Sequence, residues 1–145
     1  MGSHSHARRG LTLAELILVM VVIGLTSLLG IGQLRLYLDR VATRDAVRAA
    51  GNAIERARDE AMALQTPVSV KIDTAAVTLE LLTRGLALGK ASLGELHGVA
   101  ISTTRDSITF DVRGLGYGAA NLTLVARRGR ATDTLVTSRL GRVRY

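Results

Sequence analysis

The sequence has no cysteine and no tryptophan, and only one proline and one phenylalanine among its 145 residues. Without cysteine there is no disulfide framework, no thiolate zinc site and no cysteine nucleophile. Histidine is almost as scarce: His4 and His6 lie near the N-terminus and His97 is alone, so no group has metal-site spacing. Phosphate-loop, dinucleotide-binding and serine-hydrolase motifs are also missing. We therefore expect no enzyme activity, no metal and no cofactor.

A long apolar run stands near the N-terminus. Residues 11–29 carry one ionisable side chain, Glu15, and about 20 apolar residues in a helix span the hydrocarbon core of a bilayer. Arg8 and Arg9 precede the run, which favours a cytoplasmic N-terminal end. A secretory signal peptide has a shorter apolar region of about 7–15 residues. The run therefore predicts one membrane-spanning helix.

The following residues predict that this helix continues beyond the membrane as an amphipathic segment, over residues 11–65 in all. Pro67 predicts its end, because the residue before a proline is disfavoured in the α conformation. Gly30 and Gly32 predict a bend or local unwinding, since each glycine costs a helix about 1 kcal/mol relative to alanine. The face expected to pack on the rest of the domain consists of Ala50, Ile54, Ala57, Ala61 and Leu64.

Beyond Pro67 the apolar residues alternate with polar ones, which is typical of strands. A turn is expected at Asp73-Thr74, and residues 85–98 are predicted to form a loop because of their glycines. The fold class is therefore α+β, a long N-terminal helix packed on a small antiparallel β-sheet domain. Strands are expected at residues 68–72, 77–81, 99–102, 107–110, 121–125 and 134–137.

The start of the apolar run resembles the processing site of type IV prepilins and type II secretion pseudopilins. Residues 8–16 read RRGLTLAEL. The resemblance implies that a prepilin peptidase cuts between Gly10 and Leu11 and methylates the new N-terminus. It also implies that Glu15 pairs with the N-terminal amine on Leu11 of a neighbouring subunit. The chain departs from the family in having Leu11 where phenylalanine is usual, and in lacking a proline in the membrane helix.

The cost of placing a charge in the membrane also favours a functional role for Glu15. A charge near the membrane interior costs about 2.5–3.5 kcal/mol on insertion scales, so such a residue usually has a partner. Cleavage would leave an ammonium group on Leu11 in an apolar setting, and each charge is far better paired than alone. The alternative is that Glu15, only about one turn from the helix start, reaches the membrane surface.

The resemblance divides the chain into four parts: a leader (1–10), a transmembrane and assembly half of the helix (11–35), its amphipathic half (36–66) and a β domain with a basic tail (67–145). It implies a single-pass protein of the bacterial inner membrane. The globular domain would lie outside the cytoplasm and later in a periplasmic or cell-surface filament. The implied partners are other pilins or pseudopilins and the prepilin peptidase.

Three later segments resemble the strand motifs of the FimT/GspH branch, which contains minor pilins and minor pseudopilins. These segments are 108–114 (ITFDVRG), 122–124 (LTL) and 140–144 (LGRVR). Asp111 followed by Gly114 is typical of a strand end and turn, and we prefer that interpretation to a catalytic role.

The C-terminal third is rich in arginine. After Phe110 there are seven arginines and no lysine, against two aspartates, and arginine suits bidentate contact with phosphate. In pilus-side members of the branch a Gly-Arg-x-Arg element is associated with DNA binding during uptake, and residues 141–144 match it. The other interpretation is a solvated charged face. The candidate DNA-binding residues are Gly141, Arg142 and Arg144, with Arg127, Arg128, Arg130 and Arg139 as further contributors.

Three hypotheses follow from these observations. The first is a minor pilin of a type IV pilus that binds double-stranded DNA, since few aromatic residues are available to stack on single-stranded bases. The second is a minor pseudopilin of a type II secretion system. The third is a signal-anchored monomeric envelope protein, which predicts no cleavage after Gly10.

Overall fold

The computed structural model describes residues 12–117, 121–138 and 140–145. The chain divides into two compact units, residues 1–35 and residues 36–145. Helix α1 spans Leu13–Leu64 and contributes to both. It continues through Gly30 and Gly32, so the predicted local unwinding is not observed. It ends three residues before Pro67, as predicted.

In the first unit, α1 exposes apolar side chains on every face, including Leu16, Val19 and Ile23. None of its most apolar described stretch is buried. The helix is long and apolar enough to cross a membrane. So large an exposed apolar surface needs lipid or other protein chains to cover it.

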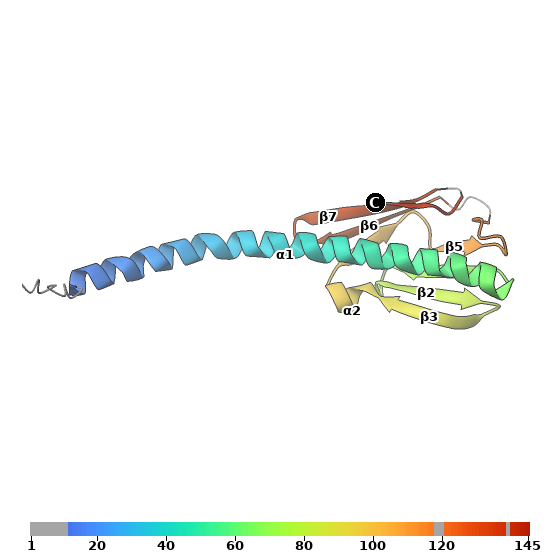
Figure 1. Cartoon of the computed structure of the whole chain (residues 1–145), viewed down its shortest axis with the longest axis horizontal. Coiled ribbons are helices and arrows are strands. Elements are labelled where there is room, and N and C mark those ends of the chain that lie inside the picture. The colour runs from blue at the N-terminus through green and yellow to red at the C-terminus, as the bar shows by residue number, and fades with distance from the viewer. Residues whose placement is uncertain (1–11, 118–120, 139) are drawn as a thin grey trace, which may run out of the picture. The chain divides into compact units, whose positions relative to one another are not determined.

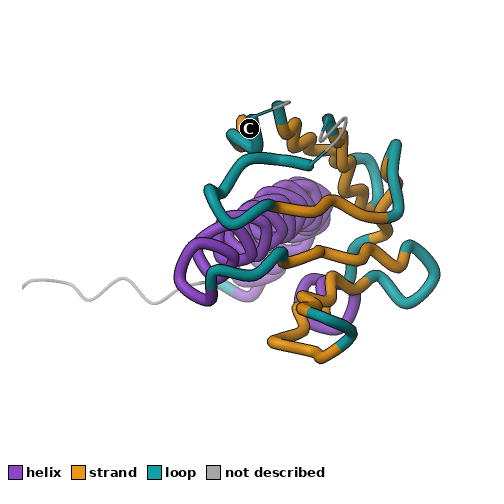
Figure 2. The backbone as a smooth tube through the Cα atoms, turned by 90° about the vertical axis from the view of Figure 1, so that its right-hand side faces the viewer, coloured by secondary structure: helices purple, strands orange, loops and turns teal. Residues whose placement is uncertain are grey.

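The described residues of the second unit form two antiparallel sheets of four strands each, which confirms the predicted α+β fold of a long helix on an antiparallel β domain. Figure 1 shows the strands of both sheets along the C-terminal part of α1, and Figure 2, turned by 90°, shows them arranged around one side of that helix. The first sheet has the order β3-β2-β1-β5 and consists of β1 (Val68–Asp73), β2 (Thr78–Thr83), β3 (Leu86–Ser92) and β5 (Ser107–Phe110). The second has the order β4-β6-β7-β8 and consists of β4 (Ala100–Thr103), β6 (Leu122–Arg128), β7 (Ala131–Thr137) and β8 (Val143–Arg144).

The predicted strand at residues 107–110 is confirmed as β5, and the other five predicted strands are confirmed with shifted ends. The turn after Asp73 is confirmed as well, since the Asp73 carboxylate accepts hydrogen bonds from the backbone N–H groups of Ala75 and Ala76. The predicted loop at 85–98 is wrong. That segment forms β3 and the short helix α2 (Leu93–His97). Its inward positions include Gly89 and Ala91, opposite Leu81 and Leu79, and such small side chains produce no alternating apolar pattern.

The core lies between α1 and the two sheets, and alanine dominates the helical side of it. Ala50, Ile54, Ala57 and Ala61 are fully buried, as predicted. Leu64 is the exception: its side chain is 47% exposed, because α1 ends there and turns away at Gln65, whose φ is positive. The sequence pattern also missed further buried residues of α1, among them Ala46, Val47 and Ala53.

Candidate functional site

Thr12 and Glu15 cap the first turn of α1. The backbone N–H of Glu15 donates to Thr12 Oγ1 (3.3 Å), and the backbone N–H of Thr12 donates to Glu15 Oε2 (3.4 Å). This reciprocal pair is a capping box, which satisfies two backbone donors at the start of a helix. The Glu15 carboxylate is thus held at the first turn, as the fifth residue of the chain that cleavage before Leu11 would leave. Gly10 and Leu11, the predicted processing site, lie outside the described residues.

Side chains along strand β8 alternate between the two faces of the sheet, and this alternation positions the predicted Gly-Arg-x-Arg element. Val143 pairs with Thr137 and packs against the core, whereas Arg144 pairs with the exposed Val136. Neighbouring residues of a strand point to opposite faces, so Arg144 lies on the outer face of the sheet. Arg142, two residues earlier, is also exposed. Tyr145 approaches α1, where its ring lies against Gly51.

The outer face of the β4-β6-β7-β8 sheet carries small polar and β-branched side chains between arginines. The strand register places its described residues in three rows across the sheet. None of these residues is acidic. The rows are Ala100, Arg127 and Thr132; then Ser102, Val125 and Thr134; then Thr123, Val136 and Arg144.

The β6–β7 hairpin tip does not join Arg142 and Arg144 as one continuous patch. Arg127 shares their face but lies four residues along the strands from the row of Arg144, which is about 13 Å at 3.3 Å per residue. Arg128 points elsewhere: its Nε lies 3.1 Å from Asp39 Oδ1 and its Nη1 donates to the carbonyl of His97 (2.7 Å). Arg130 is exposed at the tip, and Arg139 lies outside the described residues.

A tight loop before β8 sets the position of Arg142. The N–H of Ser138 donates to the carbonyl of Arg142 (2.8 Å), and the N–H of Arg142 donates to Ser138 Oγ (3.1 Å). Gly141 has a φ of 77°, and a Cβ built there would lie 2.5 Å from Phe110 Cε1. The family motif therefore has a structural reason for glycine here, since only glycine satisfies both the backbone angle and the space.

The Asp111 turn is structural, as the sequence indicated. Its Oδ1 accepts the backbone N–H groups of Arg113 (2.9 Å) and Leu115 (2.8 Å), and the N–H of Gly114 donates to the Asp111 carbonyl (2.9 Å). These donors, led by Leu115, lower the pKa of Asp111 below its ordinary value of 3.8.

We expect Asp111→Asn to lower the thermal stability of the protein at pH 7, because the ionised carboxylate accepts these bonds best. A depressed pKa stabilises the fold above the unfolded value and loses that contribution as the pH falls through the folded value. The melting temperatures of parent and variant should therefore differ at pH 7 and converge below pH 3.8. A constant difference at all pH values would contradict the role of the charge.

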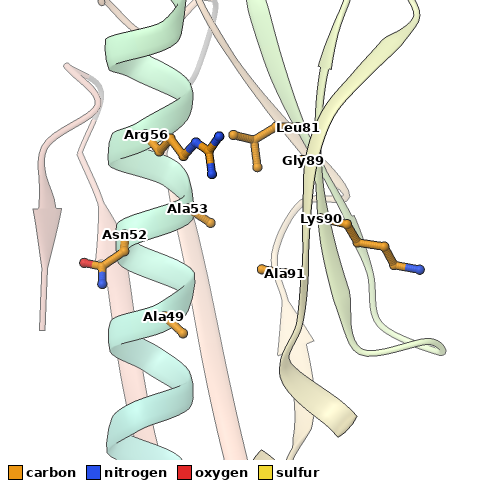
Figure 3. A pocket seen from close by; sticks show the side chains of 8 residues that line it. All are labelled: Ala49, Asn52, Ala53, Arg56, Leu81, Gly89, Lys90 and Ala91. Carbon is orange, nitrogen blue, oxygen red and sulfur yellow. The ribbon is translucent and has the colours of Figure 1, made fainter. Parts of the chain in front are cut away.

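A pocket lies between α1 and the edge of the first sheet (Figure 3), with a volume of ≈ 210 Å³. Arg56 extends from α1 toward Leu81 and Gly89, while Lys90 points away from the helix. The walls of the pocket include Ala49, Ala53 and Ala91, and no acidic, histidine or hydroxyl side chain lines it. Within the described residues no cluster of histidine and carboxylate side chains could hold a metal ion.

Comparisons with known proteins agree with this arrangement. No family model matches the chain. The chain is 30% identical over 154 aligned residues to the pilin-like protein PilA1 of Thermus thermophilus, covering 94% of this chain and 97% of the relative. Its fold is similar to that of the minor pilin FimU of Pseudomonas aeruginosa (TM-score 0.62, 17% identity, 74% of this chain and 90% of that one). It is also similar to the minor pseudopilin EpsH of Vibrio cholerae (TM-score 0.57, 14% identity, 70% and 94%).

A long apolar helix that continues into a domain of two antiparallel sheets is the fold of a pilin, and the similarity to PilA1 makes the chain a filament subunit and not an enzyme. The chain belongs to the family of type IV pilin-like proteins. As a pilin it assembles with other pilins or pseudopilins, and its apolar helix fits a membrane anchor.

Proposed function

We propose that this chain is a minor pilin of the FimT/GspH branch whose second sheet binds the backbone of double-stranded DNA. The observation that carries this proposal is the alternation along β8, which turns Val143 inward and leaves Arg142 and Arg144 exposed together. Arg127 supplies a further positive charge on the same face.

The chemistry of this face suits phosphates more than bases. Its described residues between the arginines are threonine and serine, which add hydroxyl donors, and valine and alanine, so none carries a negative charge. No aromatic side chain belongs to the three rows, so base stacking has no platform there. Arginine contacts with phosphates release counterions, and the resulting affinity is independent of sequence and falls with salt.

The proposal includes the steps before assembly. The prepilin peptidase cuts between Gly10 and Leu11 at the bacterial inner membrane, where α1 anchors the precursor, and methylates the new amine. Glu15 then pairs with that amine on a neighbouring subunit. The support is the RRGLTLAEL sequence together with the capped first turn of α1, which holds the carboxylate near the new N-terminus.

The test of DNA binding is a salt series with the full chain in detergent and a short duplex. We expect the double change Arg142→Gln and Arg144→Gln to weaken binding at low salt. It should also reduce the slope of log K against log salt by about 2, since each lost phosphate contact removes about 0.9 from that slope. Fluorescence anisotropy measures both quantities.

The matched control changes Arg84 and Lys90 to glutamine. Both are exposed, both belong to the first sheet or its turn, and the pair removes the same charge. The control should keep most of the affinity. Equal losses in both variants would mean that net charge alone attracts DNA, and absence of parent binding at low salt would refute the proposal.

The second candidate is a minor pseudopilin of a type II secretion system, which the fold of EpsH favours. In that case the same first turn of α1 serves assembly, and the arginine-rich face contacts protein. Loss of protein secretion, with DNA uptake intact, after deletion of the gene would favour this candidate.

A further inference from the structure

Gly51 is the only glycine of α1 within the second unit. Glycine weakens a helix relative to alanine, and the buried small residues near it in α1, such as Ala50 and Ala53, are alanines. A Cβ built on Gly51 would overlap the hydroxyl oxygen of Tyr145 and lie 3.0 Å from Cζ of the same ring. Gly51 therefore leaves a notch in the surface of α1, and the Tyr145 ring fills it.

Charged side chains of α1 flank this notch. Arg48 and Glu55 are three residues before and four residues after Gly51, and such positions share one side of a helix. Partial removal of water from the Tyr145 hydroxyl, together with the charge of Glu55, raises the pKa of Tyr145 above its ordinary value of 10.0, while Arg48 opposes the rise. The remaining residues that line the hollow of ≈ 250 Å³ beside the ring are Arg44 and Asp133.

Strand β8 has few contacts of its own to hold it in place. It contains two residues, whereas strands average about 5–6, and it pairs only with β7, at the edge of the second sheet. The residues on either side of Arg144 are Val143, which packs against the core, and Tyr145, which fills the notch. Arg144 points outward between two inward anchors.

We propose that Tyr145 is a positioning residue for DNA binding, because its ring in the Gly51 notch fixes Arg144 on the outer face of the second sheet. The inference rests on the proposed function and adds to it a residue that does not touch DNA. The ring acts through the backbone of β8, since Tyr145 directly follows Arg144.

The expected effect of the ring is to prepare Arg144 before DNA arrives. Without the anchor, the backbone at Arg144 is free to move in the unbound protein, and binding has to order it again. The charge of the arginine is unchanged, so its contact with a phosphate in the complex also remains. Loss of the anchor should therefore lower the affinity and leave the salt dependence as it was.

Tyr145→Ala tests this effect with the full chain in detergent and the same short duplex. We expect binding to weaken about three- to tenfold, which corresponds to the ordering of one flexible side chain and its backbone. The slope of log K against log salt should stay at the parent value. Tyr145→Phe is the conservative control, because it keeps the ring, and it should bind DNA like the parent. Fluorescence anisotropy measures all three proteins.

Gly51→Ala removes the notch while Tyr145 and both arginines stay in the chain. The new methyl group takes the place of the hydroxyl oxygen, so the ring is displaced and DNA binding should weaken by a similar factor. The protein should unfold at the parent temperature or above, since alanine favours the helix. Adding Tyr145→Phe deletes the overlapping oxygen, and the double variant should regain part of the lost affinity. Loss of stability would not explain this recovery.

An absorbance titration follows the ring without DNA. The difference between the parent and Tyr145→Phe reports the ionisation of Tyr145 alone, with a pKa above 10.0. The difference between Gly51→Ala and the double variant reports the displaced ring. Its pKa should be lower than in the parent, because water regains access to the hydroxyl.

The outcomes separate this role from DNA binding itself. Parent affinity in Tyr145→Ala would overturn the positioning role and leave the proposed function intact. The same holds if Tyr145→Phe binds as weakly as Tyr145→Ala, since the hydroxyl and not the seated ring would then matter. An unchanged Tyr145 pKa in Gly51→Ala would overturn the notch. Absence of binding by the parent at low salt would refute the proposed function, and this role with it.

Discussion

Replacing Glu15 by glutamine is expected to reduce assembled filaments about a hundredfold or more. In the proposed filament the carboxylate faces the N-terminal ammonium of a neighbour, in surroundings from which water is excluded. Removing one partner of a buried ion pair strands the other charge and costs about 3–5 kcal/mol. Glutamine is a conservative choice, because it can still accept the N–H of Thr12 in the capping box. The start of α1 therefore stays intact while the charge is lost.

The measurement compares sheared filaments with total cellular protein by immunoblot. Thr12→Ser is the matched control, since serine also caps a helix, and it should assemble like the parent. A mass measurement of the mature N-terminus shows whether the variant is still cut before Leu11. If Glu15→Gln is processed and enters filaments at the parent level, the pairing is refuted.

Replacing Gly141 by alanine should lower the free energy of unfolding by roughly 2–5 kcal/mol. About 1–2 kcal/mol comes from placing a side chain at a positive φ, and about 1–3 kcal/mol from displacing the Phe110 ring that the new Cβ would meet. Phe110 is fully buried, so its ring has little freedom to move. The displaced loop would also shift Arg142, and the proposed DNA binding should weaken although no charge has changed.

Gly85→Ala separates the two contributions. Gly85 has a similar φ of 82°, but a Cβ there would meet nothing within 4 Å. It should therefore cost only the backbone part, about 1–2 kcal/mol. Urea unfolding followed by tyrosine fluorescence is suitable, because the chain has no tryptophan. Equal losses in the two variants would show that contact with Phe110 is unimportant.

The sequence predicted the helix and six of the eight described strands, because each has a strong local pattern. An apolar run long enough to span a bilayer and a period of two between turns both depend on residues close in the chain. Strand β3 lacks such a pattern. Its inward residues Gly89 and Ala91 are small, and its outer edge is exposed. The division of the strands between two sheets depends on long-range pairing that no local pattern contains.

The positions of the arginines at the candidate site could not be predicted from a local sequence pattern either. In the sequence, Arg127, Arg128 and Arg130 look like one cluster that could join Arg142 and Arg144. A strand turns neighbours to opposite faces, so Arg127 shares the outer face with Arg144 while Arg128 contacts Asp39.

The contact of Arg128 with Asp39 and with the carbonyl of His97 has a mechanical consequence. A filament under tension loads each subunit through α1, and Asp39 lies near the N-terminal end of the part of that helix that belongs to the domain. Arg128 ties this end to β6, so the pull is shared with a strand before it reaches the alanine-rich core. The side chain that is turned away from the outer face of the second sheet thus resists separation of the helix from the domain.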